Sequence, residues 1–250
     1  NEKLQTAVVS IDNRSGAVRV MLGGTNYEKS QFNRALSKNR MIGSSFKPIV
    51  YMSAMQNLGY HPGTVLVDEP MLFELPHNKK WEPANYNDEY MGPVVLKKAL
   101  AKSLNIISAK LIFKVKPVEV IKTARKFGFN SPLRENFSLA LGATGASPLE
   151  LASAYSTIAN LGVHIEPFYV SKIEDYQGNI LYEHFIENEK RFEPEVIYPL
   201  LDMMQGVMND GSGRVIRRMG FNHPAAGKTG TTNAFRDAWF TGFTKDFTTS

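Results

Sequence analysis

The sequence has 250 residues and contains no cysteine, which excludes disulfide bonds, thiolate metal ligands and cysteine nucleophiles. Long hydrophobic runs are missing as well. No stretch approaches the roughly 18 apolar residues of a membrane span, and the first residues show no basic segment followed by a hydrophobic one. We therefore expect neither a membrane anchor nor a signal peptide within this sequence.

A strong excess of one charge is also absent, because the formal net charge is only +5. Lysine and arginine are spread along the chain, and the densest basic run, residues 214–220, is typical of a solvated surface. We therefore expect no nucleic-acid partner. The histidines have no metal-ligand spacing, so we expect no metal and no cofactor. They are His61, His77, His164, His184 and His223.

Turn-forming residues separate short β-branched runs at both ends of the chain. Residues 7–11 and 17–22 flank DNRSG and predict an opening hairpin. Residues 237–244 and 247–250 predict a second hairpin, and the chain stops inside its last strand. Helical periodicity fills much of the sequence between these hairpins. We therefore predict an α+β fold, in which an antiparallel sheet from both chain ends is packed by helices.

The best-marked helix follows Ser147. This serine as N-cap, Pro148 in the first turn and Glu150 three residues after the cap form a capping box, and Gly162 is the predicted stop. Two further helices are predicted to start at Pro117 and Glu193. The segment 60–92, rich in proline and aromatic residues, is predicted to be a long irregular surface excursion.

Residues 41–50, MIGSSFKPIV, place two serines, a lysine and a proline ahead of an apolar run. Pro48 has no N–H and clashes with the carbonyl four residues earlier, so the helix is predicted to begin at about Ser44 or Ser45. Ser44 would then lie at the helix N-terminus, with Lys47 on the same face. A neutral lysine can take a hydroxyl proton, which makes Ser44 the nucleophile candidate. The alternative is a capped helix with a solvated lysine, and this short pattern alone does not exclude it.

The stretch KSLNIISAKL contains a second polar pair, Ser103 and Asn105. Two residues apart on a regular helix, they would face different ways, so they reach one site only if the backbone is locally non-helical. Serine and asparagine tolerate such a break. The alternative is an ordinary polar helix cap before an apolar helix.

The stretch GKTGT invites a nucleotide-binding interpretation, but Asn222 stands where the phosphate-binding loop needs a glycine. As a strand, it would place Lys228 and Gly230 on one face and Thr229 and Thr231 on the other. We predict that the glycine lets a substrate backbone lie close to the strand and that the threonines bind an oxyanion or carboxylate. The alternative is a glycine-punctuated strand with surface threonines.

Ser-x-x-Lys, Ser-x-Asn and Lys-Thr-Gly in this order are typical of penicillin-binding proteins and serine β-lactamases. The chain resembles the transpeptidase domain of a class A penicillin-binding protein almost end to end. The matching stretches are VVSIDNRSGAVRVMLGG, QFNRAL, GSSFKP, WEPANYNDEYMGPVVLKKALAKSLN, LALGATGASPLELASAYSTIANLG and GKTGTTNAFRDAWFTGFT. The resemblance implies one transpeptidase domain over residues 1–250, with the penicilloyl serine transferase or β-lactamase-like fold and a helical subdomain.

The resemblance also implies roles for the matching residues. Ser44 would attack the terminal D-alanyl-D-alanine of a peptidoglycan stem peptide, with Lys47 as general base. Ser103 would relay a proton to the leaving amine, and Asn105 would orient the lysine and hold the peptide amide. Lys228 would set the electrostatics of that relay. The acyl-enzyme would pass to the amine of a second stem peptide, whereas β-lactams would stay attached.

For the strand near the C-terminus, the resemblance implies substrate binding. The hydroxyl groups of Thr229 and Thr231 would take the substrate carboxylate, and Gly230 and Thr232 belong to the same substrate-binding set. The backbone N–H groups of Ser44 and Thr231 would form the oxyanion hole.

Members of this family carry a membrane anchor and a glycosyltransferase domain before the region matched here, and a further part of the last strand with a closing helix after it. None of these is in the 250 residues, so the resemblance implies transpeptidation alone. It also implies that the parent protein is membrane-anchored and that this domain lies on the extracytoplasmic face of a bacterial cytoplasmic membrane, in the periplasm or cell wall space.

Three alternatives to a transpeptidase share these motifs. A D,D-carboxypeptidase would pass the acyl group to water, and a serine β-lactamase would need a dedicated base to activate that water, which the sequence does not reveal. A non-catalytic module would bind stem peptides or β-lactams without turnover.

Overall fold

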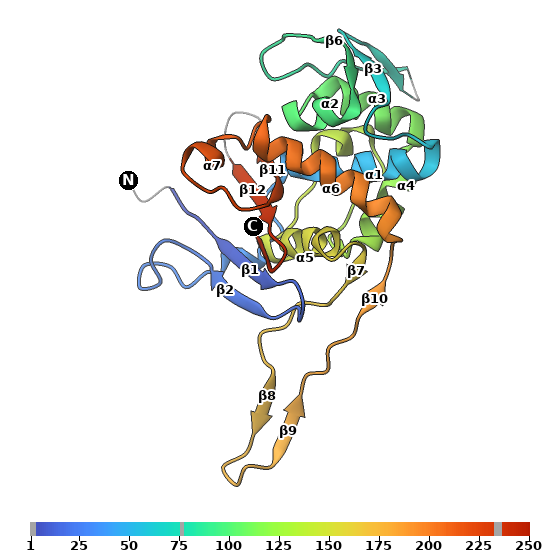
Figure 1. Ribbon diagram of the computed structural model, residues 1–250. Helices are drawn as coiled ribbons and strands as arrows, with labels where there is room; N and C mark the ends of the chain where they lie inside the picture. The colour runs from blue at the N-terminus through green and yellow to red at the C-terminus, as the bar shows by residue number, and fades with distance from the viewer. Residues whose placement is uncertain (1–3, 76–77, 233–236) are drawn as a thin grey trace.

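The computed structural model describes residues 4–75, 78–232 and 237–250. Its centre is a five-stranded antiparallel sheet in the order β11-β12-β13-β1-β2, which unites the two ends of the chain (Figure 1). The strands are β1 (Val8–Asp12), β2 (Val18–Leu22), β11 (Ala226–Thr231), β12 (Ala238–Phe243) and β13 (Phe247–Thr249). Both predicted hairpins and the sheet that joins them are confirmed.

Side-chain alternation explains how β1 sits in this sheet. Val9 and Ile11 are fully buried and form a small apolar cluster beneath the sheet, whereas their neighbours face the other side. Gly16 adopts a φ of +78° in the turn to β2, a conformation that favours glycine. On its other edge β1 pairs with β13, with Ser10 opposite Thr249. The first and last strands are therefore neighbours.

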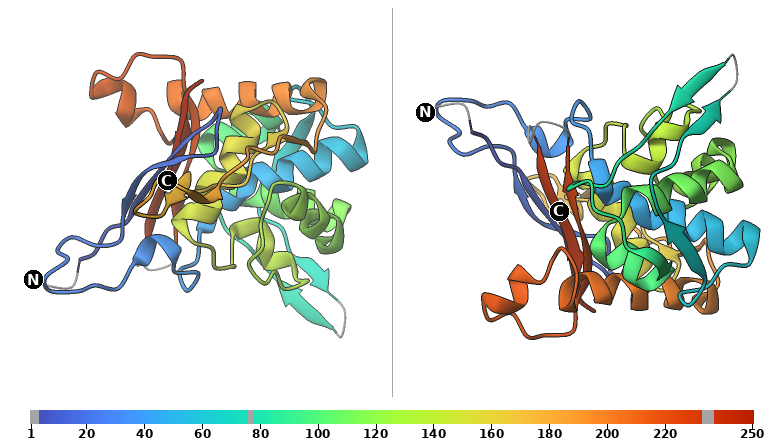
Figure 2. Two further views of the ribbon diagram at one scale, coloured as in Figure 1. Left: turned by 90° about the horizontal axis from the view of Figure 1, so that it is seen from below. Right: turned by 90° about the horizontal axis from the view of Figure 1, so that it is seen from above.

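Helices cover one face of the sheet and continue into a helical subdomain, and a short helix lies on the other side of the sheet (Figures 1 and 2). The helices of the covered face and the subdomain are α1 (Lys47–Leu58), α2 (Leu96–Lys102), α3 (Asn105–Val115), α4 (Pro117–Lys126), α5 (Pro148–Ala159) and α6 (Pro194–Asn209), and the helix on the other side is α7 (Val215–Arg218). α5 packs against β1, β12 and β13, and α6 packs against β11. α1 runs through the middle of this layer, and its first eight residues are buried.

The predicted helix after Ser147 is confirmed as α5, but its capping box is only half formed. The Ser147 side chain accepts a hydrogen bond from the Glu150 N–H at 3.1 Å. The Glu150 carboxylate does not return to the cap, because it accepts hydrogen bonds from the N–H groups of Asn130 and Ser131 at 2.5 Å each. Glu150 therefore joins α5 to the loop after α4.

The predicted irregular excursion over residues 60–92 is wrong in part. It contains β3 (Val65–Asp68), which pairs with β6 (Gly92–Val95), and the small hairpin of β4 (Phe73–Leu75) and β5 (Lys79–Trp81). The rings of Phe73 and Trp81 pack at a centroid distance of 5.3 Å. Cross-strand pairing of β-branched and aromatic residues explains this order, which local composition did not reveal.

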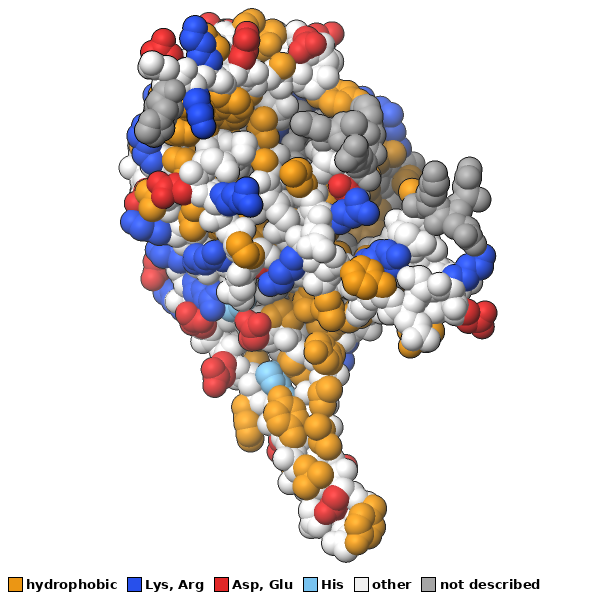
Figure 3. Space-filling view, turned by 180° about the vertical axis from the view of Figure 1, so that it is seen from behind, with side chains coloured by type: hydrophobic (Ala, Val, Ile, Leu, Met, Phe, Trp, Pro, Cys, Tyr) orange, Lys and Arg blue, Asp and Glu red, His pale blue; other side chains and the backbone are white. Residues whose placement is uncertain are grey.

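A hairpin of β8 (Lys172–Glu174) and β9 (Ile180–Glu183) projects from the body beyond β7 (Val163–His164) and β10 (Glu189–Lys190) (Figure 1). Apolar side chains line one side of this arm in the space-filling view (Figure 3). Within the described parts of the chain, no helix has the length and apolar character needed to cross a membrane.

Candidate active site

The candidate nucleophile lies on a short 3₁₀ helix, η2 (Gly43–Phe46), directly before α1. Ser44 is half-buried, whereas Ser45 is fully buried. The buried hydroxyl of Ser45 points toward β11, since a Cβ added at Gly230 would lie 2.4 Å from Ser45 Oγ. Only the hydroxyl of Ser44 is therefore open to a reactant.

The predicted helix start near Ser44 or Ser45 is wrong, because the regular α-helix begins at Lys47. The 3₁₀ turn absorbs the constraint of Pro48: the Ser44 carbonyl accepts its hydrogen bond from the Lys47 N–H instead. The alternative of a capped helix with a solvated lysine is also wrong. Neither η2 nor α1 has a side-chain cap, and Lys47 is fully buried.

The local break that Ser103 and Asn105 need in order to reach one site is present. This serine separates α2 from α3 and adopts a left-handed conformation, with φ 60° and ψ 39°. The break directs both its carbonyl and its hydroxyl, together with the Asn105 side chain, toward the Lys47 amine, as the hydrogen bonds show. The alternative of an ordinary polar helix cap is therefore wrong for this pair.

The Lys47 amine lies at the centre of a compact polar cluster. Its Nζ donates to the Ser103 carbonyl at 2.6 Å and to Asn105 Oδ1 at 2.7 Å, and it lies 3.3 Å from Ser103 Oγ. Segments 56 and 58 residues away along the chain thus meet at this amine. The first two motifs therefore lie side by side in the fold, as predicted.

The third motif reaches the same cluster from β11. Lys228 Nζ donates to Ser103 Oγ at 2.9 Å and to the Thr229 carbonyl at 3.0 Å. As predicted, alternation buries Lys228 and Gly230, whereas Thr229 is half-buried and Thr231 is exposed. Ser103 Oγ therefore lies between two amines, one from α1 and one from the sheet.

Burial lowers the pKa of both lysines. The pKa of Lys47 falls well below the ordinary lysine value of 10.5, mainly through burial and further through the charge of Lys228. Burial alone lowers the pKa of Lys228 to about 7. Lys47 carries the additional repulsion of the Lys228 charge. Both amines therefore lose their protons more readily than an ordinary lysine.

Two glycines, Gly43 and Gly230, allow η2 to lie close to β11. A Cβ at Gly43 would lie 2.5 Å from the Thr231 carbonyl, and one at Gly230 would lie 2.5 Å from the Ile42 carbonyl. Gly43 also has a φ of +54°. The prediction that Gly230 makes room for a substrate is therefore wrong about what fills that room: the glycine admits η2 itself. Gly43 meets the backbone of Thr231 in the same way.

The two outer threonines of the motif have different surroundings. Thr229 Oγ1 lies 2.5 Å from Ser212 Oγ, whose loop is anchored by a bond from the Ser212 N–H to the Ala101 carbonyl at 3.0 Å. Thr232 Oγ1 accepts from the Asp237 N–H at 3.0 Å. Its hydroxyl is thus engaged within the chain. Residues 233–236, which belong to the matched stretch GKTGTTNAFRDAWFTGFT, lie outside the described residues.

Several supporting residues escaped the sequence analysis. Tyr155 of α5 is buried and donates to the Ser45 carbonyl at 2.7 Å, and Trp239 Nε1 donates to the Met41 carbonyl at 2.9 Å. These bonds hold both ends of η2. Asn85 and Ser212 contribute from other loops. Such contacts join residues far apart in sequence, and the only local sign of them was that Tyr155, Trp239 and Asn85 fall within stretches that carried the family resemblance.

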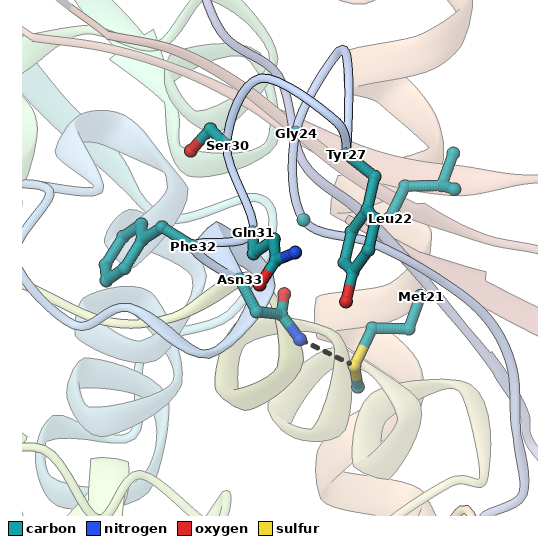
Figure 4. Close-up of a pocket in the computed structure, with 9 residues that line it drawn as sticks. Met21, Leu22, Gly24, Tyr27, Ser30, Gln31, Phe32 and Asn33 are labelled. Atoms are coloured by element: carbon teal, nitrogen blue, oxygen red, sulfur yellow. Dashed lines mark hydrogen bonds between the residues drawn. The ribbon is translucent and has the colours of Figure 1, made fainter.

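Features typical of other kinds of site lie elsewhere or are missing. The described residues hold no group of three or more His, Asp or Glu side chains arranged to bind a metal ion. A cavity of about 240 Å³ lies between the end of β2 and the following loop, with Tyr27, Gln31 and Asn33 around it (Figure 4). None of the predicted site residues lines this cavity.

Comparison with known proteins gives one family. The model of the penicillin binding protein transpeptidase domain matches residues 6–249. Penicillin-binding protein 1A of Aquifex aeolicus is 37% identical over 241 residues, and the match covers 96% of this chain and 33% of that protein. Penicillin-binding protein 1A of Neisseria lactamica is 34% identical over 255 residues, covering 99% and 32%. The chain thus spans about one third of the length of these relatives.

Solved structures agree with this result. Penicillin-binding protein 1A from Haemophilus influenzae has a TM-score of 0.92 at 28% identity, covering 99% of this chain and 42% of that one. The PonA1 protein of Mycobacterium tuberculosis, in complex with penicillin V, has a TM-score of 0.80 at 25% identity, covering 98% and 69%. The expected penicilloyl serine transferase fold is confirmed.

Proposed function

Because the chain belongs to the penicillin-binding protein transpeptidase family, we propose that it is a serine acyltransferase that cross-links peptidoglycan stem peptides through an acyl-enzyme on Ser44. The observation that carries this proposal is the convergence of Lys47, Ser103 and Lys228 in one cluster, with the half-buried Ser44 one turn before Lys47. The substrate would be a stem peptide ending in D-alanyl-D-alanine, and β-lactams would acylate the same serine. No cofactor takes part.

The hydrogen bonds of Lys47 explain how it would act as a base. A neutral amine has two N–H bonds and one lone pair. The two N–H bonds are directed to the Ser103 carbonyl and to Asn105 Oδ1, which leaves the lone pair to accept the proton of Ser44 as its oxygen attacks. Asn105 would thereby orient the lysine, and its amide would also hold the peptide.

Ser103 would complete the proton path to the leaving group. Its Oγ lies 3.3 Å from Lys47 Nζ and accepts from Lys228 at 2.9 Å. The proton taken from Ser44 would pass through this hydroxyl to the nitrogen of the departing D-alanine while the C–N bond breaks. The cationic Lys228 would favour this transfer and attract the substrate carboxylate. The amine of a second stem peptide would then attack the ester and restore Ser44.

The edge of β11 would hold the substrate. The hydroxyl groups of Thr229 and Thr231 would bind the terminal carboxylate, with Gly230 and Thr232 completing the wall. The N–H groups of Ser44 and Thr231 would stabilise the oxyanion, and the close approach of Gly43 to Thr231 supports their proximity.

Two buried carboxylates bear on the alternative of rapid hydrolysis. Among the described acidic residues, Asp68 and Glu150 are buried, and both are already engaged by protein donors. Neither is placed as a free base for water. Neither therefore provides the dedicated base that rapid β-lactam hydrolysis would need. We further propose that the parent protein carries a membrane anchor and a glycosyltransferase domain, as the class A family does, and acts on the extracytoplasmic face of the membrane.

Labelling with a fluorescent penicillin tests this function. Ser44→Ala should abolish covalent labelling, because it removes the hydroxyl group that is the proposed nucleophile. The matched control is Ser45→Ala, which should retain labelling, since Ser45 Oγ is buried without a hydrogen-bond partner. Intact-protein mass spectrometry should show one penicilloyl adduct per chain. Labelling that survives Ser44→Ala, or penicillin hydrolysis at many turnovers per second, would overturn the proposal.

A further inference from the structure

The polar cluster around Lys47 continues through Asn105 into the segment before β6. Asn105 Oδ1 accepts from Lys47, and its Nδ2 donates to the Ala84 carbonyl at 2.8 Å. Both sides of this amide are thus engaged, so its orientation depends on where the backbone at residue 84 lies. The segment 60–92 therefore helps to hold Asn105 in place.

The next residue, Asn85, is buried and makes five hydrogen bonds across this junction. Its Oδ1 accepts from the backbone N–H of Asn105 at 2.8 Å and of Ile106 at 3.3 Å. Its Nδ2 donates to both carboxylate oxygens of Asp68 at 3.0 Å and to the Glu89 carbonyl at 2.9 Å. One side chain thus joins the first turn of α3 to the end of β3.

These surroundings require a carboxamide. Two N–H donors face the oxygen of Asn85, and a carboxylate with a carbonyl faces its nitrogen, so each side of the amide meets only complementary groups. The N-cap residue of α3, Leu104, provides no side-chain hydrogen bond. Asn85 therefore caps α3 from 20 residues away in sequence.

Asp68 completes the arrangement from the ribbon of β3 and β6. It is 1% exposed, and it accepts a further hydrogen bond from the Met91 N–H at 3.0 Å. A buried carboxylate held by an amide and a backbone donor has little freedom to move. The ribbon, through Asp68, thus fixes Asn85 in the place from which it holds α3.

We propose that Asn85 and Asp68 are positioning residues of the acyl-transfer reaction. Together they hold the first turn of α3 so that Asn105 Oδ1 meets the Lys47 amine. This inference rests on the proposed function of Ser44. Neither residue touches the reacting atoms, and both act through Asn105. The ribbon of β3 and β6 is then a structural support for the catalytic base.

An exchange of the two side chains tests this role. Asn85→Asp preserves volume but sets two carboxylates against each other. It should lower the second-order rate constant of penicillin acylation by a factor on the order of 100, the scale of a small displacement of a catalytic group. The double variant Asp68→Asn/Asn85→Asp restores the hydrogen bond between the two side chains, because the amide then donates from position 68, and a carboxylate oxygen at position 85 still accepts from α3. The bond to the Glu89 carbonyl stays lost, so the exchange should recover about tenfold of the lost rate and not all of it.

The matched control is Asn13→Asp, the same substitution at another buried asparagine, which directly follows β1. It should leave the acylation rate within about twofold of the unsubstituted protein at temperatures where it remains folded.

If Asn85→Asp does not fold, Asp68→Asn alone should still slow acylation about tenfold. An unchanged rate in Asn85→Asp or, where that variant does not fold, in Asp68→Asn would overturn the inference. So would an exchange that restores thermal stability without restoring rate. Absence of labelling in the unsubstituted protein would instead overturn the proposed function, and this inference with it.

Discussion

Two polar clusters lie at different places in the fold, and they differ in the chemical groups that they contain. The site cluster consists of Lys47, Ser103, Asn105 and Lys228. The turn cluster consists of Asn13, Ser156 and Thr248: Asn13 Oδ1 accepts from Ser156 Oγ at 3.1 Å and Thr248 Oγ1 at 2.6 Å. Asn13 Nδ2 also donates to two carbonyls of the turn between β12 and β13.

The difference between the clusters is the presence of ionisable groups. The turn cluster is neutral, and its hydrogen bonds join β1, α5 and β13, so it stabilises the fold. The site cluster buries two amines, whose desolvation opposes folding. Such buried amines make the site reactive but lower the free energy of unfolding. Substitutions in the two clusters should therefore have opposite effects on acylation and on unfolding.

The largest effect is expected at the base. Lys47→Met should lower the rate of penicillin acylation by about 10³-fold, because a thioether cannot take the proton of Ser44. Its free energy of unfolding should change by less than about 2 kcal/mol, since relief of amine desolvation offsets the lost hydrogen bonds. Stopped-flow labelling and urea denaturation measure the two quantities. A substituted protein that acylates at the original rate would exclude Lys47 as base.

The turn cluster should give the reverse result. Asn13→Ala should reduce the free energy of unfolding by about 2–4 kcal/mol, because it leaves buried hydroxyl and carbonyl groups without partners. Acylation should stay within about twofold when measured on the folded protein. Denaturant titration paired with labelling on the same sample checks this. A loss of acylation larger than the loss of folded protein would show that the two clusters are coupled.

The two lysines should also give acylation a distinctive pH profile. The second-order rate constant should rise as Lys47 loses its proton, at a pH well below 10.5, and should fall as Lys228 loses its charge near pH 7. At saturating penicillin the falling limb should move to higher pH, because the bound carboxylate favours cationic Lys228. Labelling kinetics between pH 5 and pH 10 provide the test, and Lys228→Met should remove the falling limb.

The smallest effect concerns stability as a function of pH. Both lysines have a lower pKa folded than unfolded, so between about pH 7 and pH 10 the unfolded chain binds more protons. The free energy of unfolding should therefore decrease as the pH decreases through this window. Each lysine should contribute at most about 1.4 kcal/mol per pH unit to this decrease. Lys228→Met should flatten the slope, whereas Asn13→Ala should leave it unchanged.

Local patterns predicted the parts of the fold that depend on local physics. The two hairpins and the helix after Ser147 all follow from turn formers, capping residues and periodicity. Ser44 was distinguished from Ser45 by spacing alone, and the structure adds a physical reason, because Ser45 is buried against Gly230.

Other features depend on contacts that no local pattern encodes. The role of Gly230 arises from the close approach of η2 and β11, and Gly230 lies 186 residues beyond Ser44 (230 minus 44). The ribbon of β3 and β6 appeared irregular because its strands are short and lie 24 residues apart (92 minus 68). Hydrogen bonds such as that between Asp68 and Asn85 leave no periodic pattern in the sequence.

The glycine contacts between η2 and β11 limit how this site can vary. A Cβ at Gly142 would lie 1.8 Å from the Gly43 carbonyl, so that Gly43 is enclosed by backbone from two directions. No larger residue fits at these positions without moving the nucleophile away from its base. If the proposed function holds, substitutions that slow acylation by β-lactams should therefore avoid these glycines and be found instead at exposed side chains beside β11, such as Ser212.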